Sequence, residues 1–167
     1  TDRSMDLLIN LFFTQTMNQL CTYADERCAD SRLPVPVRFF MDDFATNCRI
    51  DNFENMISNI RSRKISAILI LQSLSQLEQS YDMGAHTIVD DCDTMIYMGG
   101  NDPKTASSIA TRCNKTTQTI LHMPLCTSWI FRRGAQPFMC RNMELDDYLH
   151  QKGIVTKCMR EAQVYME

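Results

Sequence analysis

The sequence predicts an α/β fold in which a mostly parallel sheet is flanked by helices and is followed by a C-terminal β-hairpin. Three observations support this prediction. Short apolar runs alternate with stretches of helical period, a spacing typical of βαβ units. The run Ile65–Leu71 is apolar almost throughout, as expected of a strand in a parallel sheet covered on both faces. Two later strand-like runs are separated by a glycine turn, which favours the hairpin.

The first third of the chain predicts a long helix and a buried strand. From about Ser4 to Ala29, apolar residues recur at three- and four-residue steps, so one face of a helix is apolar. Pro34 cannot continue that helix. The apolar run Pro36–Met41 then predicts a strand, which ends abruptly in the acidic pair Asp42-Asp43.

The middle of the chain predicts further helices around two strands. Asp51 can cap a helix that Glu54 supports as a box-like pair, and that helix ends in the basic run Arg61–Lys64. Gln72 stands at the tip of the strand that follows. We expect the remaining middle elements to be helices at 74–81 and 85–90, a strand at 94–98, and a helix from an Asp102 cap to about Cys113.

The last third changes in character. Thr117–His122 and Ser128–Arg132 are strand-like, and Gly134 marks a turn before Gln136–Cys140. The tail from Asp146 onward is polar and is expected to be helical in part. The predicted division is a domain over residues 1–148 and a polar tail over 149–167.

Composition bounds the class of protein. A chain of 167 residues with 44% apolar and 22% charged residues is typical of one globular domain. The net charge of -3 gives no overall attraction to nucleic acid, so any contact with DNA needs a local patch. No apolar stretch reaches the roughly 18–20 residues that span a bilayer. The N-terminus lacks an initiator Met and a signal-peptide pattern, so we expect it to be a cut in a longer chain.

The eight cysteines are widely spaced and form no Cys-x-x-Cys, and the three histidines do not cluster with them. This pattern favours free, buried thiols in a reducing cytosol over a zinc site or a disulfide framework.

The acidic pair is the most informative motif. An apolar strand followed by two acids is a Walker B pattern, in which Asp42 would hold Mg²⁺ and Asp43 would orient or deprotonate the attacking water. Gln72 lies at the next strand tip and suits a γ-phosphate sensor, because carboxyl ends of parallel strands share one edge. Arg61 and Arg63, at the end of the intervening helix, could reach a neighbouring subunit's nucleotide as an arginine finger. A helix-end role for these arginines and a capping role for the glutamine are the plainer interpretations.

A phosphate cradle is missing from the sequence. No G-x-x-x-x-G-K-[ST] occurs, and none of the five glycines precedes Gly84. We therefore expect this chain alone not to hydrolyse ATP.

Several blocks together resemble the C-terminal half of TraG/TraD-type coupling proteins of type IV secretion (conjugation) systems. The blocks are Thr1–Ser4, Val35–Phe44 (VPVRFFMDDF), Ile60–Leu77 (IRSRKISAILILQSLSQL), Thr94–Pro103 (TMIYMGGNDP), Met123–Leu125 and Arg132–Phe138. The resemblance covers roughly residues 1–148. It implies the Walker B half of a partial RecA-like P-loop NTPase fold, related to FtsK-type translocases.

The resemblance also implies a role. Such proteins are hexameric ATPases, anchored on the cytoplasmic side of the bacterial inner membrane, that use ATP and Mg²⁺. Their partners are DNA, relaxase and relaxosome proteins, and components of the secretion channel. Their Walker A loop, membrane anchor and all-α domain would precede this chain.

Carried over residue by residue, Asp42 and Asp43 match the Walker B acids, Gln72 the motif glutamine and Arg61 the arginine finger. Asp43 departs from the more usual glutamate by one methylene, which affects its reach as a general base. Nothing in the family pattern matches the tail after Leu149.

Two other functions are alternatives to the coupling ATPase. A phospho-receiver domain would place its acids near the chain start and an isolated Asp at the tip of a later strand. Here a helix and a loop precede the acids, and Gln72 and Gly99 stand at the later strand tips. A non-catalytic module that binds substrate or neighbouring subunits is the main alternative. Arg132, Arg133 and Arg141 around the hairpin favour it, although charge at a hairpin edge also prevents aggregation.

Overall fold

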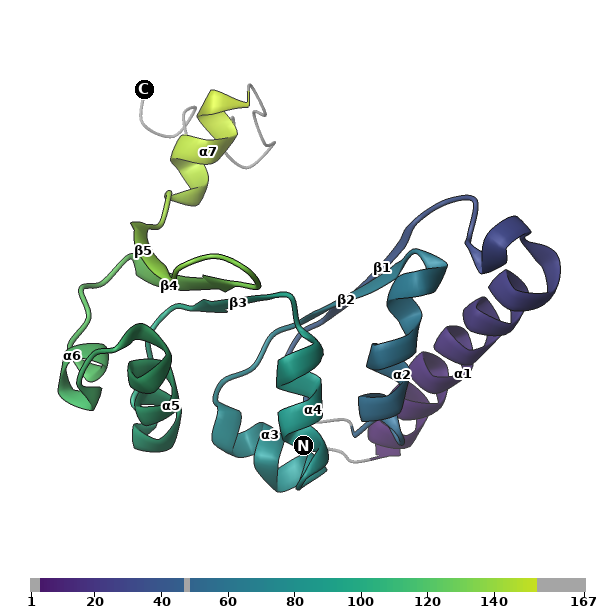
Figure 1. Cartoon of the computed structure of the whole chain (residues 1–167), viewed down its shortest axis with the longest axis horizontal. Coiled ribbons are helices and arrows are strands. Elements are labelled where there is room, and N and C mark those ends of the chain that lie inside the picture. Colours follow the sequence, from purple (N-terminus) through teal and green to yellow (C-terminus); the bar gives the residue numbers. More distant parts are fainter. Residues whose placement is uncertain (1–3, 47–48, 153–167) are drawn as a thin grey trace, which may run out of the picture.

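The computed structural model describes residues 4–46 and 49–152 of the chain (Figure 1). Its elements in chain order are α1 (Ser4–Arg27), η1 (Ala29–Ser31), β1 (Val37–Met41), α2 (Phe53–Ile60), η2 (Arg61–Arg63), β2 (Ile65–Leu69), α3 (Leu74–Tyr81), α4 (Gly84–Asp91), β3 (Thr94–Tyr97), α5 (Pro103–Cys113), α6 (Thr117–Leu121), β4 (Thr127–Arg132), β5 (Phe138–Arg141) and α7 (Leu145–Gln151). The predicted α/β class is confirmed.

The first half of the described chain is built on a parallel strand pair. β1 pairs with β2 in register from Val37 opposite Ile65 to Met41 opposite Leu69. Side chains alternate along a strand, so Phe39 and Met41 point to the same side and are buried there. Helices α1 to α4 lie on that side of the strands (Figure 1) and supply Met17, Phe53 and other residues of the core.

The opposite face of the parallel pair is uncovered in the described part of the chain. Phe40, Ile68 and Ile70 keep 66%, 38% and 49% of their surface exposed. The expectation of a sheet covered on both faces is therefore wrong for these residues. The apolar run at 65–71 does contain side chains suited to burial on both sides, but the helices in the described ranges cover only one.

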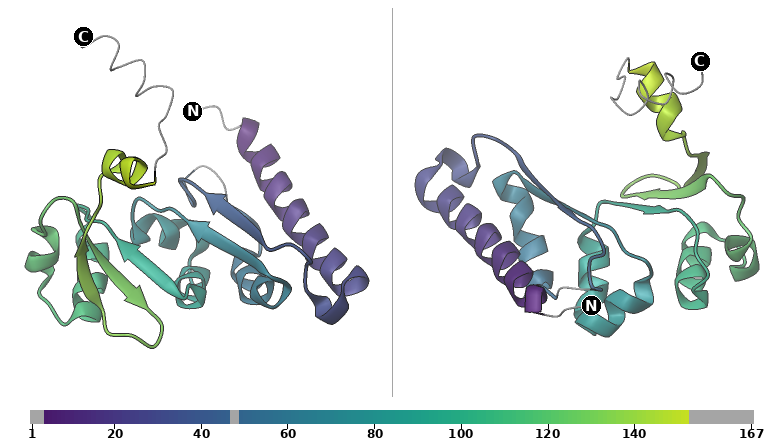
Figure 2. Two further views of the ribbon diagram at one scale, coloured as in Figure 1. Left: turned by 90° about the horizontal axis from the view of Figure 1, so that it is seen from above. Right: turned by 180° about the vertical axis from the view of Figure 1, so that it is seen from behind.

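The second half contains an antiparallel sheet in the order β3-β4-β5. The hairpin of β4 and β5 is confirmed, with Thr127 opposite Arg141 and Ile130 opposite Phe138. β3 pairs with β4 and not with β2. A separate small core packs this sheet against α5 and α6, and this part forms one end of the molecule while α1 forms the other (Figure 2).

The strand expected at 117–122 is a helix, α6 (Thr117–Leu121). Thr116 caps it, because its side chain accepts a hydrogen bond from the Thr119 N–H. Two threonines and an isoleucine favour a strand by local preference, but the capping residue and the packing of Ile120 in the second core select a helix.

The caps of α2 and α5 contrast. Asp102 caps α5 as expected: its carboxylate accepts from the Thr105 N–H, and Pro103 follows at the first helical position. The cap expected at Asp51 is wrong. The residue before α2 is Asn52, with a positive φ of 60° and no side-chain cap bond.

Helix α7 spans the boundary predicted between residues 148 and 149, and the tail beyond residue 152 lies outside the described residues. Of the cysteines, Cys48 and Cys158 also lie outside the described residues. The described cysteines are free, but they are not fully buried as expected: Cys126 is exposed and the others are half-buried. Partial burial raises the pKa of Cys21, Cys92 and Cys113. Over the described ranges, no helix combines the length and apolar character needed to cross a membrane.

Candidate functional site

The acidic pair lies on a tight turn that follows β1. The strand ends at Met41, and residues 42–46 form the turn. Asp43 has φ 50°, in the left-handed region, which aspartate tolerates better than most residues. Its backbone N–H donates to Asp42 Oδ1 at 3.0 Å. Both carboxylates are exposed, so their remaining oxygens are open to a ligand.

Backbone bonds to the neighbouring strand fix this turn. The Ile70 N–H donates to the Met41 carbonyl at 2.9 Å, and the Phe44 N–H donates to the Ile70 carbonyl at 3.0 Å. The parallel ladder therefore continues past the end of both strands and holds the acids against the segment that leads to Gln72.

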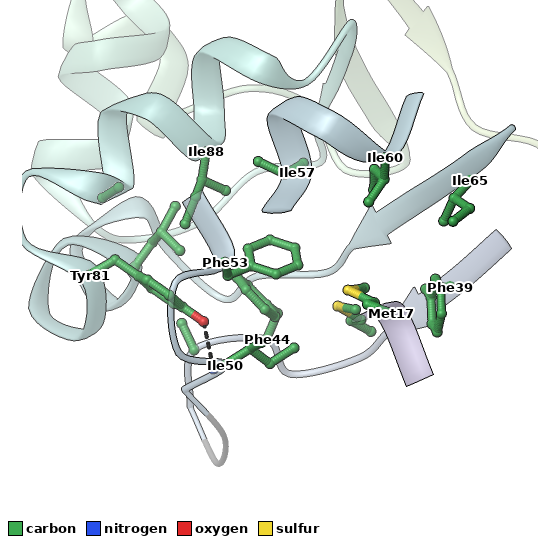
Figure 3. Packing of buried hydrophobic residues seen from close by; sticks show 14 of the residues in the cluster. Met17, Phe39, Phe44, Ile50, Phe53, Ile57, Ile60, Ile65, Tyr81 and Ile88 are labelled. Carbon is green, nitrogen blue, oxygen red and sulfur yellow. Dashed lines mark hydrogen bonds between the residues drawn. The ribbon is translucent and has the colours of Figure 1, made fainter. Parts of the chain in front are cut away.

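An aromatic cluster anchors the far end of the turn (Figure 3). Phe44 stacks on Tyr81 with ring centroids 5.5 Å apart and packs against Phe53 at 4.8 Å. The Ile50 N–H donates to Tyr81 Oη at 2.9 Å. The Arg49 guanidinium lies 5.6 Å from the same ring centroid. The acid-bearing turn is thus held between a backbone ladder and a buried aromatic core.

Gln72 meets the acidic pair directly. Its Nε2 donates to Asp43 Oδ1 at 2.9 Å across 29 positions of sequence. Gln76 Nε2 donates to Gln72 Oε1 at 3.3 Å, and Thr46 Oγ1 donates to Gln76 Oε1 at 3.5 Å. The structure thus brings together the two strand tips that the sequence pattern paired. Sequence reasoning missed Gln76, although its position one helical turn after Gln72 was a usable signal.

After the third strand, β3, the residue that contacts the start of α3 is Asp102 and not Gly99 or Gly100. Asp102 Oδ2 accepts from Ser75 Oγ at 2.7 Å, from Thr105 Oγ1 at 2.5 Å and from the Thr105 N–H at 3.1 Å. Thr105 Oγ1 in turn accepts from the Leu74 N–H at 3.0 Å. These donors lower the pKa of Asp102 to about 2. We call this group the Asp102 clamp; it joins the start of α3, just after Gln72, to the start of α5.

Arg61 is not part of this edge. It begins η2, ahead of β2, and therefore lies at the opposite end of the strand from Gln72. Five strand residues span roughly 17 Å. Its guanidinium is 3.6 Å from Asp93, with 77% of the side chain exposed.

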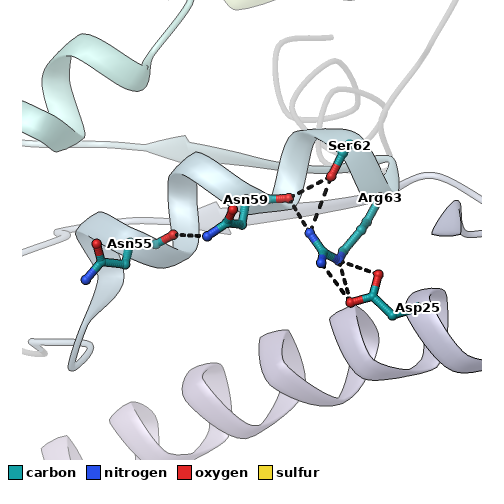
Figure 4. Close-up of polar contacts among 5 residues, drawn as sticks. All are labelled: Asp25, Asn55, Asn59, Ser62 and Arg63. Carbon is teal, nitrogen blue, oxygen red and sulfur yellow. Dashed lines mark hydrogen bonds and ion pairs between the residues drawn. The ribbon is translucent and has the colours of Figure 1, made fainter.

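The other arginine of η2 has a structural partner (Figure 4). Arg63 Nε and Nη2 donate to the Asp25 carboxylate at 3.0 and 2.7 Å, and Nη1 donates to the Asn59 carbonyl at 2.8 Å. The hydrogen bond to Asp25 raises the pKa of Arg63. Arg63 therefore ties η2 to α1, and Arg61 is the arginine of this turn that faces solvent.

The arrangement offers a hard-oxygen site with few protein ligands. No group of three or more His, Cys, Asp or Glu side chains among the described residues could hold a metal ion. Mg²⁺ commonly keeps several waters and takes one or two carboxylates plus phosphate oxygens. Asp42 and Asp43 fit that mode, whereas a cage made wholly of protein ligands is not present in the described ranges.

Comparison with solved structures shows the fold. The bacterial conjugative coupling protein TrwBdeltaN70, in a trigonal form with sulphate, aligns with a TM-score of 0.71 and 16% identity over 83% of this chain and 37% of that chain. The plasmid coupling protein TrwB in complex with ADP and Mg²⁺ aligns with a TM-score of 0.65 and 16% identity over 86% of this chain and 38% of that one. The chain thus spans less than two fifths of these structures.

Sequence comparison identifies the family. No curated protein sequence matches the chain. A family model described as the TraM recognition site of TraD and TraG matches residues 36–121. This match covers more than half of the chain and includes the acid-bearing turn, Gln72 and the Asp102 clamp. The chain therefore belongs to the TraG/TraD family, in the region described as the TraM recognition site.

Proposed function

We propose that this chain is the Walker B part of a coupling ATPase that, in the whole protein, drives DNA into a type IV secretion channel during conjugation. The observation that carries the proposal is the hydrogen bond between Gln72 and Asp43, which joins two strand tips at one edge. The relatives support it, because TrwB has been solved with ADP and Mg²⁺ and with a non-hydrolysable ATP analogue.

Each residue has a role in this proposal. Asp42 holds Mg²⁺ through its water shell, as a hard carboxylate ligand. Asp43 positions the water that attacks the γ-phosphate, and Gln72 contacts the same nucleotide edge. The bond from Gln72 to Asp43 leaves the second oxygen of that carboxylate available for water.

The phosphate cradle is supplied by another part of the whole protein. The sequence contains no Walker A loop, and the solved relatives are more than twice as long as the aligned region. The exposed apolar side chains on the outer face of β1 and β2 fit a sheet that such a part covers. In this proposal the chain alone binds ATP weakly and does not turn it over.

Arg61 acts between subunits. Because it lies at the strand end opposite Asp43, it does not reach the nucleotide held by the acids of its own chain. A hexamer on the cytoplasmic side of the inner membrane would place it against the nucleotide of a neighbour. The weak ion pair to Asp93, at 3.6 Å and largely exposed, costs little to break.

A second candidate function is non-catalytic binding of relaxosome proteins. The observation that favours it is the family description itself, which names recognition of TraM. It is compatible with the first function, because one chain can carry an ATPase edge and a docking surface. Titration of the 167-residue chain with purified TraM tests it, and absence of heat or of chemical-shift changes would reject it.

The ATPase proposal is tested in a longer protein that joins this chain to its upstream half. We expect Asp42→Ala and Asp43→Asn each to lower kcat by roughly 100-fold or more, and Lys104→Ala, an exposed residue of α5, to leave it unchanged. Full activity of Asp42→Ala would reject the magnesium assignment. Normal turnover by Arg61→Ala hexamers would reject the finger.

A further inference from the structure

Helix α3 is hydrogen-bonded to the acid-bearing turn. Gln76 Oε1 accepts from Thr46 Oγ1 at 3.5 Å, and Ser80 Oγ donates to the Ala45 carbonyl at 2.8 Å. Gln76 and Ser80 are four residues apart, so both lie on the same face of the helix. This face of α3 therefore lies along the turn that carries the two acids.

The direction of the Gln72 amide depends on α3. Gln72 Oε1 accepts from Gln76 Nε2 at 3.3 Å, and Gln72 Nε2 donates to Asp43 Oδ1 at 2.9 Å. The Thr46 N–H donates to the Asp43 carbonyl at 3.1 Å, which closes a ring of hydrogen bonds. We call the ring of Thr46, Gln76, Gln72 and Asp43 the glutamine chain. A shift of α3 would move Gln76 and turn the Gln72 amide away from Asp43.

The first turn of α3 is held from another side by the Asp102 clamp. Ser75, the neighbour of Gln76, donates to Asp102 Oδ2 at 2.7 Å, and the Leu74 N–H donates to Thr105 Oγ1 at 3.0 Å. Thr105 is only 7% exposed and lies in the first turn of α5. The first N–H groups of a helix have no partner within it, so the bond from Leu74 fixes a group that is otherwise unpaired.

The clamp holds this turn of α3 more firmly than the glutamine chain does. The bonds at the Gln76 side chain measure 3.3 and 3.5 Å, which is long, and they join neutral groups. The bond from Ser75 to Asp102 measures 2.7 Å and has an ionised acceptor. Such bonds are roughly twice as strong as neutral ones. The clamp therefore sets the position of the turn, and the glutamine chain follows it.

We propose that Ser75 and Asp102 are positioning residues, which act through α3 to aim the Gln72 amide at Asp43. The proposal rests on the proposed ATPase function and adds to it a link from the second core, which contains residues of α5, to the acidic edge. Ser75 and Asp102 do not contact the nucleotide in this proposal. Their loss therefore lowers kcat and leaves KM for ATP unchanged.

The first measurement uses the 167-residue chain and needs no ATP turnover. Ser75→Ala is the test variant, because it breaks the link to α3 and leaves Asp102 to cap α5. We expect it to shift the side-chain amide signals of Gln72 in a proton–nitrogen NMR spectrum. Ser107→Ala is the matched control: it removes the same atom from an exposed position of α5, where the hydroxyl makes no hydrogen bond within the described ranges.

The second measurement uses the longer protein that joins this chain to its upstream half. We expect Ser75→Ala to lower kcat by roughly 10- to 100-fold with KM for ATP unchanged, as for other misplaced catalytic groups. Ser75→Thr keeps the hydroxyl and should retain the activity. In a Gln72→Ala background, Ser75→Ala should cause no further loss, because a residue that acts through Gln72 has nothing left to position.

Three outcomes would overturn the proposal. They are unchanged Gln72 amide signals in Ser75→Ala, an equal shift in Ser107→Ala, and an undiminished further loss of kcat in the Gln72→Ala background. Failure of the ATPase function gives a different result, in which Gln72→Ala keeps full turnover while Ser75→Ala still shifts the Gln72 signals. That result would confirm that the clamp aims the amide and reject a role for the amide in turnover.

Discussion

Gln72 is oriented before any ligand arrives. Gln76 donates to the amide oxygen of Gln72, which leaves the amide nitrogen to face Asp43. An amide suits this position because it offers both a donor and an acceptor. A carboxylate at the same place would put two negative charges at hydrogen-bond distance, where even water leaves a repulsion of about 1 kcal/mol.

This repulsion gives a prediction for Gln72→Glu. We expect the free energy of unfolding at pH 7 to fall by roughly 0.5–1 kcal/mol, and most of the loss to disappear in 1 M salt because the pair is exposed. Urea denaturation at two salt concentrations measures it. Gln79→Glu, at an exposed position on the helix α3 that follows Gln72, controls for the added charge. An equal effect in the control would mean that the contact with Asp43 is irrelevant.

Tyr81 supports the acid-bearing turn at a distance from the acids. Its hydroxyl accepts the Ile50 N–H, and its ring stacks on Phe44 at the end of the turn. We expect Tyr81→Phe to cost about 1–2 kcal/mol, because a buried N–H is left without its acceptor. Hydrogen exchange should accelerate at Ile50 before it does in β1. Tyr148→Phe, which alters an exposed tyrosine, should change neither, and protection of Ile50 in Tyr81→Phe would contradict the anchor.

At the scale of elements, the sequence predicted the strands and helices whose formation depends on residues close together in the chain. The strands at 37–41 and 65–69 followed from apolar runs, and α5 followed from the Asp102-Pro103 start. The helix at 117–121 was missed because the β-preference of its threonines concealed the capping signal of Thr116. The pairing of β3 with β4 depends on contacts 30 or more positions apart, which no local period encodes.

The candidate functional site, like the fold, was predicted only in part from the sequence. The acids and Gln72 were paired correctly by one topological rule, that carboxyl ends of parallel strands share an edge. The same rule, applied to Arg61 ahead of β2, places that residue at the far end. The Asp102 clamp could not be derived, because it depends on how α3 and α5 pack against each other.

The Asp102 clamp makes the free energy of unfolding depend on pH. The pKa of Asp102 is lowered from 3.8 to about 2 in the folded chain. The contribution of the Asp102 carboxylate to the free energy of unfolding is therefore complete above pH 4 and is lost as the pH falls toward 2. We expect Asp102→Ala to cost roughly 0.5–2 kcal/mol at pH 7, as for other N-caps. Thermal unfolding from pH 6 to 2.5 should show the two proteins converging at low pH. A difference that is constant with pH would exclude the ionised carboxylate as the cause.

At the scale of the whole molecule, two separate cores divide the chain. One contains Phe53 and Ile88 beneath the parallel strands, and the other contains Ile109 and Ile120 beneath the antiparallel sheet. The clamp is a polar contact between them. A molecule of this kind can open one part while the other stays folded.

Hydrogen exchange tests this division. We expect Ile109→Ala, which removes a fully buried side chain, to cost roughly 2–5 kcal/mol and to speed exchange mainly in β3 to β5 and α5. Ile88→Ala should produce the reverse pattern, with the loss of protection in β1 and β2. Uniform loss of protection in either variant would show that the two cores unfold as one unit.

The uncovered face of the parallel strands gives the last prediction. Phe40 and Ile68 are direct partners in register, and both point away from the core. In the 167-residue chain, Phe40→Ser with Ile68→Thr should leave the free energy of unfolding within about 0.5 kcal/mol, as for other surface substitutions. It should also reduce self-association, since an exposed apolar pair is a contact site.

Phe39→Ser is the control for this double variant, because Phe39 is adjacent to Phe40 in sequence but is buried on the other face of the strands. Phe39→Ser should destabilise the chain by several kcal/mol, whether it is studied alone or within the longer protein. Phe40→Ser with Ile68→Thr should become destabilising only in the longer protein, where, under the proposed function, a further part of the domain packs on this face. If sedimentation and unfolding show no such difference between the short and long proteins, the face is a true surface, and the phosphate cradle must join the acidic pair from the edge of the sheet alone.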